Sequence, residues 1–90
     1  MTKNAFDQVK EIFGSRCEQT VIDRETCAKI VIDEAHDIEI SGCGTKTRPF
    51  SVYLWLLSPR REILEREFDI MSLDTLEKVV NSFTEKVQAN

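Results

Sequence analysis

Three cysteines and one histidine are the side chains of this sequence best suited to metal binding or nucleophilic chemistry: Cys17, Cys27, His36 and Cys43. A structural zinc site needs four such ligands, most often arranged in closely spaced pairs. Here nine, eight and six residues separate successive candidates, and no Cys-x-x-Cys pair occurs. We therefore expect no metal and no cofactor, and we expect free thiols in the reducing environment of the cytoplasm.

Cys43 is the candidate nucleophile, because it lies in the flexible stretch Ser41-Gly42-Cys43-Gly44. The nearby Lys46 and Arg48 would lower the pKa of its thiol and favour the reactive thiolate. The alternative is a loop that contains an unreactive cysteine. A Cys43–His36 pair lacks an orienting third group, and the sequence has neither a glycine-rich phosphate loop nor a nucleophile elbow. We therefore do not expect an enzyme.

Acidic residues gather in the first half of the chain. Residues 18–39 carry seven acids and two bases, a net charge of −5, within a total of −4 for the whole chain. Four of these acids surround a short polar turn that we predict to be a hairpin connection: Asp33, Glu34, Asp37 and Glu39. Such carboxylates can dock on an arginine-rich protein or imitate the charge of phosphates. The alternative is a plain solvated edge. We expect Asp33 and Asp37 to hold His36 protonated.

A basic segment without acids follows at residues 40–61, with a net charge of +4. Its bases form two pairs on either side of the most apolar stretch, Lys46 with Arg48 and Arg60 with Arg61. A strand of eight to ten residues is about 30 Å long, so the pairs should lie at its opposite ends. Two arginines at a hairpin tip can clamp a phosphate, which makes a small nucleic-acid-binding module the alternative function. Otherwise they are solvated turn residues.

Two amphipathic helices are predicted to flank the strands. The first ends at Gly14 and has an apolar stripe at helical spacing, formed by Phe6, Val9, Ile12 and Phe13. The second begins at Ser72 or Asp74, and Asp74 with Glu77 is typical of a capping box. Its stripe also recurs every three or four residues, at Leu73, Leu76, Val80, Phe83 and Val87.

Alternation of apolar and polar residues predicts an antiparallel sheet of three or four strands between these helices. The alternating segments are residues 28–32, 38–40, 50–57 and 64–70, and residues 20–22 form a candidate short strand. In the last segment we expect Leu64, Arg66, Phe68 and Ile70 to share one face. The helices must bury their stripes on one face of the sheet. The fold class is therefore α+β, a two-layer sandwich of order α-β-β-β-β-α, in one small domain of residues 1–90.

The strand at residues 50–57 has apolar residues on both faces. One face should lie under the helices, whereas the other carries Tyr53, Trp55 and Leu57 and would meet water in a two-layer sandwich. Exposed apolar patches usually mark interfaces, and Trp and Tyr are enriched among binding hot spots. Tyr53 and Trp55 are therefore predicted to form a partner or homodimer interface. The alternative is a helix on each face, or a Trp55 covered by the chain termini.

Together these features predict a cytoplasmic, non-enzymatic module that binds another protein. It would act as an inhibitor or adaptor that docks its acidic hairpin and aromatic strand face on a partner such as a nucleic-acid-binding enzyme. No apolar run approaches the ~18 residues that span a membrane, and the N-terminus has no apolar signal segment. The residues predicted to carry the function are Asp33, Glu34, Asp37, Glu39, Tyr53, Trp55, Arg60 and Arg61.

Overall fold

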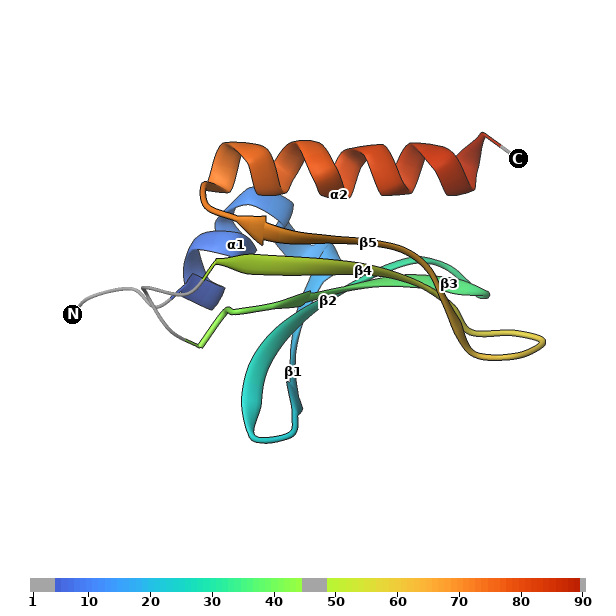
Figure 1. The fold of residues 1–90 in the computed structure, drawn as a ribbon, viewed down its shortest axis with the longest axis horizontal. Coiled ribbons are helices and arrows are strands. Elements are labelled where there is room, and N and C mark those ends of the chain that lie inside the picture. Colours follow the sequence, from blue (N-terminus) through green and yellow to red (C-terminus); the bar gives the residue numbers. More distant parts are fainter. Residues whose placement is uncertain (1–4, 45–48, 90) are drawn as a thin grey trace.

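A computed structural model describes residues 5–44 and 49–89, which form two helices around one antiparallel sheet (Figure 1). The elements are α1 (Ala5–Phe13), the short 3-10 helix η1 (Gly14–Arg16), β1 (Cys17–Ile22), β2 (Glu25–Asp33), β3 (His36–Ser41), β4 (Phe50–Leu56), β5 (Glu62–Ile70) and α2 (Leu73–Gln88). The strands follow one another in the order β1-β2-β3-β4-β5, so each pairs with its neighbour in sequence. The predicted α+β class is confirmed.

The predicted number of strands is wrong, because the sheet has five. The short strand expected at residues 20–22 extends over β1 and pairs with β2 along its whole length. Asp23 and Arg24 connect the two strands with φ angles of 51° and 67°, which is the geometry of a type I′ turn. Asp-Arg lacks the glycine that normally marks this turn, and half of the β1 side chains are polar. The sequence around β1 therefore predicts a strand only weakly.

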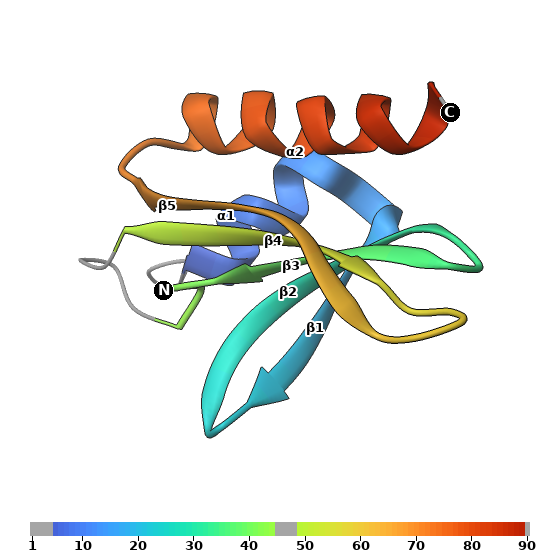
Figure 2. The same cartoon turned by 45° about the vertical axis from the view of Figure 1, so that its right-hand side comes forward.

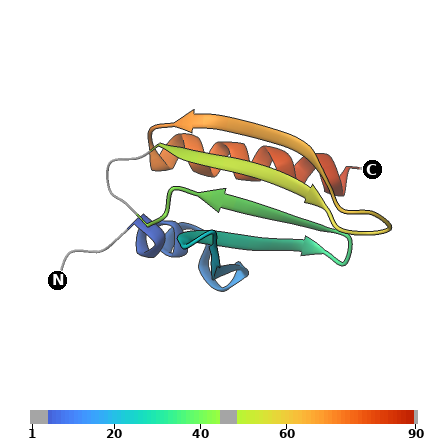
Figure 3. The same cartoon turned by 60° about the horizontal axis from the view of Figure 1, so that its bottom comes forward.

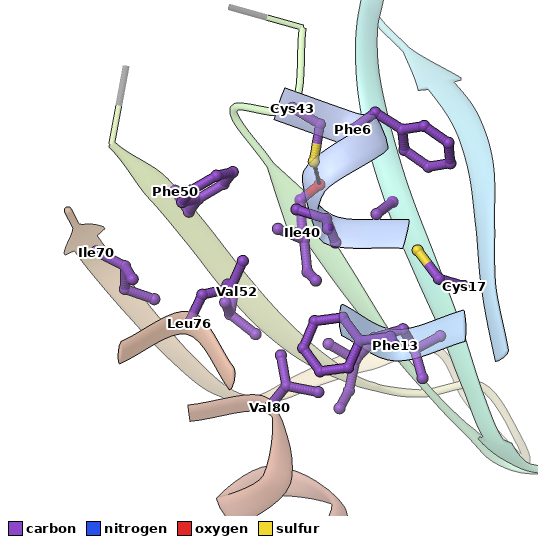
Figure 4. Packing of buried hydrophobic residues seen from close by; sticks show 14 of the residues in the cluster. Phe6, Phe13, Cys17, Ile40, Cys43, Phe50, Val52, Ile70, Leu76 and Val80 are labelled. Carbon is purple, nitrogen blue, oxygen red and sulfur yellow. Dashed lines mark hydrogen bonds between the residues drawn. The ribbon is translucent and has the colours of Figure 1, made fainter. Parts of the chain in front are cut away.

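Both helices cover the same face of the sheet, which makes the fold a two-layer sandwich (Figure 3). Helix α1 packs on β1 and β2, whereas α2 packs on β3, β4 and β5. The core between the layers contains the predicted helix stripes together with alternate residues of the strands (Figure 4). Its fully buried members include Val9, Ile30, Ile38, Leu76 and Val80. Alternation places every second strand residue on the opposite face.

The helix ends follow backbone and capping chemistry. Gly14 follows α1 with a φ of 66°, as its predicted role at the end of the helix requires. Ser72 is the N-cap of α2, and its side-chain oxygen accepts a 3.1 Å hydrogen bond from the Thr75 N–H. Of the two predicted caps, Ser72 is therefore confirmed. The predicted Asp74–Glu77 capping box is wrong, because Asp74 already lies in the first helical turn.

Strand β5 departs from simple alternation. Its register against β4 shifts twice, between Phe50 and Val52 and between Leu54 and Trp55 of β4. Each shift inserts an extra residue and reverses the faces of the residues beyond it. The prediction that Phe68 and Ile70 share a face is consequently wrong: Ile70 is buried in the core, whereas Phe68 contacts Tyr53 on the opposite face. Asp69 lies within the first of these shifts and has a φ of 56°.

Cys43 is buried in the core and does not lie in an exposed turn. Its carbonyl accepts a 2.9 Å bond from the Phe6 N–H, and its thiol lies 3.5 Å from the Ile40 carbonyl (Figure 4). Burial raises the pKa of Cys43 to about 12, so the thiolate is scarce at neutral pH. The structure therefore favours the alternative, a loop that contains an unreactive cysteine. Lys46 and Arg48, which were expected to lower this pKa, lie outside the described residues.

Within residues 5–44 and 49–89, the helices are too short and too polar to cross a bilayer. The same part of the chain contains no group of three or more His, Cys, Asp or Glu side chains arranged to hold a metal ion.

Candidate functional site

The face of the sheet opposite the helices is left uncovered by the described elements, and we call it the open face. It is formed by the residues that alternate with the core positions in each strand, because successive side chains of a strand point to opposite sides. Figure 2 shows the sheet twisted strongly, with the β1–β2 hairpin bending away from the helices. The open face includes Ile22, Lys29, Val31, Asp37, Glu39, Tyr53, Trp55, Ile63 and Phe68.

Two aromatic residues of β4 form the centre of the open face. Tyr53 meets Phe68 of β5 edge to face, with ring centroids 5.8 Å apart. The Arg61 guanidinium lies over the Trp55 ring, 4.6 Å from its centroid, in a cation–π contact. Both central residues are partly exposed. The structure thus places Tyr53 and Trp55 where the sequence predicted them, on the face without helices.

Exposed apolar side chains surround this aromatic centre. Ile22 is 38% exposed, Ile63 is 38% exposed, and Val31 and Phe68 are each 49% exposed. They come from both edge strands and from β2, so the apolar character extends across the sheet. Such a contiguous apolar patch on a small protein is typical of a binding surface.

Two carboxylates of β3 lie beside the aromatic centre. Asp37 pairs in register with Trp55, and Glu39 pairs with Tyr53. Asp37 is only 7% exposed, and its carboxylate lies 3.9 Å from the Lys29 ammonium. Burial raises the pKa of Asp37, and Lys29 and Arg61 oppose this rise. Burial also raises the pKa of Glu39, whereas the Trp55 indole and Arg61 act to lower it. For both acids, the loss of hydration on burial therefore raises the pKa by more than the neighbouring groups lower it.

The indole N–H of Trp55 is a buried donor that finds no acceptor of good geometry within the described part of the chain. It is close enough to Glu39 to lower the pKa of that carboxyl, but the contact does not satisfy the geometry of a hydrogen bond. Buried donors are nearly always paired, and leaving one unpaired costs about 1–3 kcal/mol. The Glu39 carboxylate is therefore the acceptor within reach of this buried N–H.

Two hollows cross the open face. One of 320 Å³ is lined by Ile22, Asp23, Glu25, Cys27, Glu39, Ser41, Tyr53, Trp55 and Ile63. A second of 260 Å³ is lined by Thr20, Ile22, Lys29, Asp37, Glu39 and Arg61. The first hollow contains three acids and no base, whereas the second contains both signs of charge. Their shared residues, Ile22 and Glu39, make them parts of one depression between β1 and β5.

The acidic residues predicted as one hairpin surface divide between two places. Asp33 and Glu34 lie at the β2–β3 turn, whereas Asp37 and Glu39 lie on the open face. Asp33 accepts a 2.8 Å bond from the Ala35 N–H and lies 2.9 Å from His36 Nδ1. Its contact with His36 lowers the pKa of Asp33. The expectation of a single acidic surface is wrong, because alternation in β3 turns Asp37 away from the His36 side.

The two arginines of the β4–β5 turn also separate. Arg61 folds back over Trp55 and joins the open face, whereas Arg60 stays exposed at the turn. The pair therefore does not form the two-arginine clamp expected at a hairpin tip. The other basic pair, Lys46 and Arg48, lies outside the described residues.

The open face contains residues that the sequence did not single out. Lys29 and Val31 alternate with the buried Ile30, and this pattern was a usable signal for their position. Phe68 reaches the face only because of the register shift between Phe50 and Val52, and local sequence carries no clear mark of that shift. Ile63 lies beyond both shifts, whose reversals cancel, so simple alternation counted from Ile70 also places it on this face. Ile22 reaches the same depression as Ile63 because the sheet is curled.

A larger hollow of 610 Å³ lies on the helix side, lined by residues that include Leu64, Val87 and Ala89. Its polar groups already contact one another. Lys86 contacts Glu65 at 2.9 Å, and the Asp33–His36 pair described above also lies in this hollow. The open face has the exposed aromatic and apolar side chains and is therefore the better candidate site.

Compared with known proteins, the chain matches no family model, no curated protein and no solved structure.

Proposed function

We propose that this protein is a non-enzymatic binding module that docks the open face of its sheet on another protein. The single observation that carries the proposal is Trp55, a partly exposed aromatic residue at the centre of an uncovered apolar face. A partner that covers this face would bury the ring and the surrounding apolar side chains. Aromatic anchors of this kind dominate the energy of many protein interfaces.

The charges favour a partner with a basic surface. The hollow beside Trp55 is lined by Asp23, Glu25 and Glu39, and the described part of the chain places no base among its lining residues. Asp33 and Glu34 add negative charge at the β2–β3 turn. A basic partner would stabilise these carboxylates and associate faster through long-range attraction. This is consistent with an inhibitor or adaptor in the cytoplasm that blocks a basic surface, such as that of a nucleic-acid-binding enzyme.

Direct nucleic-acid binding is the weaker proposal. Arg61 is held over Trp55 and faces the carboxylates of Asp37 and Glu39, so its charge is largely compensated. A phosphate backbone on this face would meet acids as well as bases. A catalytic role finds little support, because burial raises the pKa of Cys27 to about 11 and that of Cys43 to about 12.

Two neighbouring residues of β5 provide a matched test. Ile63 is 38% exposed and lines the open-face hollow, whereas Leu64 is 43% exposed and lines the hollow on the helix side. We expect Ile63→Asp to weaken capture of the partner from native extract roughly 30-fold, as loss of a hot spot of about 2 kcal/mol does. Leu64→Asp introduces the same charge on the other face and should leave capture unchanged.

Capture is quantified with the unaltered protein, Ile63→Asp and Leu64→Asp as baits, after nuclease treatment and over a salt series. Melting curves establish that both variants are folded. Equal capture by the two variants would show that the open face is not the docking surface. Capture that disappears with nuclease, and declines steeply with salt, would favour nucleic acid as the ligand.

A further inference from the structure

The two edges of the sheet are protected very differently. Strand β5 has five charged side chains in nine residues, two register shifts and the left-handed Asp69. Charges, bulges and irregular backbone are the usual features that stop an edge strand from pairing with another chain. The β5 edge is therefore closed to strand addition.

Strand β1, at the other edge, has much less of this protection. Its sequence Cys-Glu-Gln-Thr-Val-Ile contains one charge and no proline, and its register with β2 is continuous. Val21 is 63% exposed, the most exposed apolar residue of the sheet. The β1–β2 hairpin bends away from the helices in Figures 1 and 2, so the outer side of β1 is accessible.

The turn geometry shows which backbone groups of β1 point outward. In a two-residue type I′ hairpin, the residues that flank the turn form a hydrogen-bonded pair, here Ile22 with Glu25. Bonded and non-bonded pairs then alternate along an antiparallel ladder. Ile22, Thr20 and Glu18 therefore bond to β2, and the N–H and C=O groups of Val21, Gln19 and Cys17 point away from it.

One observation confirms this assignment independently. The Lys10 ammonium on α1 donates a hydrogen bond to the Cys17 carbonyl, which is an outward group in this scheme. Lys10 thus occupies the first outward position of the edge. Gln19 and Val21 keep outward donors and acceptors that no other group in the described part of the chain engages.

We propose that β1 pairs antiparallel with β1 of a second copy, about a two-fold axis at Thr20. Gln19 of each copy lies opposite Val21 of the other, and each such pair exchanges both of its backbone hydrogen bonds. A pairing centred on Gln19 needs the Cys17 carbonyl, which Lys10 already occupies. A pairing centred on Val21 uses only one residue pair. The Thr20 register is the one that engages every free outward group.

The free outward groups support a second copy as the occupant. Gln19 and Val21 are two residues apart and each offers one backbone donor and one acceptor, so a two-fold pairing satisfies these groups in both copies at once. Arg16 in η1 and Arg24 in the β1–β2 turn lie outside the strand, so neither takes a position in this ladder. The dimer joins two sheets with their open faces on the same side, and one surface then presents two copies of the proposed docking site.

Cysteine cross-linking tests the register directly. Thr20 lies opposite itself across the two-fold axis in a non-hydrogen-bonded pair, where Cα atoms are about 4.5 Å apart, within the range of a disulfide. Thr20 also pairs with the free thiol Cys27 of its own chain, so both cysteine variants are made in a Cys27→Ala background. In that background we expect Thr20→Cys to form a disulfide-linked dimer on mild oxidation. Glu18→Cys, on the same face of the same strand, lies opposite Ile22 of the second copy and should remain monomeric on non-reducing gels. Equal cross-linking of the two variants would overturn the register.

Sedimentation tests the edge itself without new thiols. Val21→Pro removes only an outward N–H, so the β1–β2 ladder keeps its bonds and the fold should persist. We expect the unaltered protein to dimerise with increasing concentration, Val21→Thr to behave like it, and Val21→Pro to raise the dimer dissociation constant about tenfold or more. Circular dichroism checks that both variants are folded. A monomeric unaltered protein, or a Val21→Pro dimer of undiminished affinity, would overturn the proposal. Ile63 lies on β5, at the opposite edge of the sheet from β1. Loss of partner capture in Ile63→Asp therefore leaves the dimer measurement unaffected, so the two proposals can fail separately.

Discussion

At the scale of single residues, the open face combines Trp55 with acids that are costly to bury. Asp37 is almost fully buried, and Lys29 at 3.9 Å and Arg61 compensate its charge only in part. Burial therefore raises the pKa of Asp37 above its ordinary value. A residue kept at such a cost, beside a partly exposed Trp55, is better explained by binding than by stability.

The raised pKa of Asp37 predicts a pH-dependent stability. Ionisation of a carboxyl whose folded pKa is raised destabilises the fold above that pKa, and this cost disappears as the pH falls through it. Asp37→Asn should therefore raise the melting temperature at pH 7. The gain over the unaltered protein should shrink as the pH falls through the folded pKa of Asp37. Thermal melts across this pH range measure both effects.

Asp33 provides the control of opposite sign. Its pKa is lowered by His36, so its ionised form stabilises the fold above the unfolded pKa, and this contribution is lost as the pH falls through the folded pKa. Asp33→Asn should lower the melting temperature at pH 7, by a small amount because the group is exposed. If Asp33→Asn and Asp37→Asn shift the melting temperature in the same direction, the assigned burial cost of Asp37 is incorrect.

At the scale of elements, the strength of the local signal decides what the sequence can reveal. Helix α2 has a complete apolar stripe and a Ser N-cap, and both were predictable from residue type and spacing. Half of the β1 side chains are polar and its turn lacks glycine, so only part of the strand was anticipated. Strand β5 alternates in sequence, but its bulges place Phe68 on the open face.

The N-cap of α2 can be tested by one substitution. Ser72→Ala removes the acceptor of the Thr75 N–H and should lower the free energy of unfolding by about 1 kcal/mol. Ser82→Ala, in the exposed middle of the same helix, should change it by no more than a few tenths of a kcal/mol, with a slight gain from helix propensity. Urea denaturation of both variants measures the difference. Equal losses would show that the cap is not the source.

At the scale of the whole molecule, two layers leave one face of the sheet without a protein cover. The three cysteines lie in different parts of this two-layer arrangement. Cys17 and Cys43 belong to the core between the layers, whereas Cys27 is buried at the edge of the open-face hollow. Alkylation of Cys17 and Cys43 in the native state therefore requires the two layers to separate. For Cys27, a local opening of the open-face hollow is enough.

This arrangement predicts the pattern of alkylation. Cys17 and Cys43 should react in the native state at one common rate, set by global unfolding. Leu76→Ala deletes a fully buried side chain between the layers and should destabilise the protein by about 2–5 kcal/mol. It should therefore increase the alkylation rates of Cys17 and Cys43 by the same factor, and the rate of Cys27 by no more than this factor. Mass spectrometry of peptides after timed alkylation resolves the three sites. Cys43 reacting ahead of Cys17 would contradict the shared core.

The sequence by itself determined the α+β class, the two helix stripes and the position of Tyr53 and Trp55 on the face away from the helices, because periodicity and caps are local properties of the chain. Only the tertiary structure decided how the charged side chains are distributed between the open face and the turns. Alternation turns Asp37 and Glu39 onto the open face while Asp33 stays at the turn, and the β4–β5 hairpin folds Arg61 over Trp55. The burial of Cys43, the bulges of β5 and the unprotected edge of β1 also depend on packing and pairing between distant segments, which residue type alone does not encode.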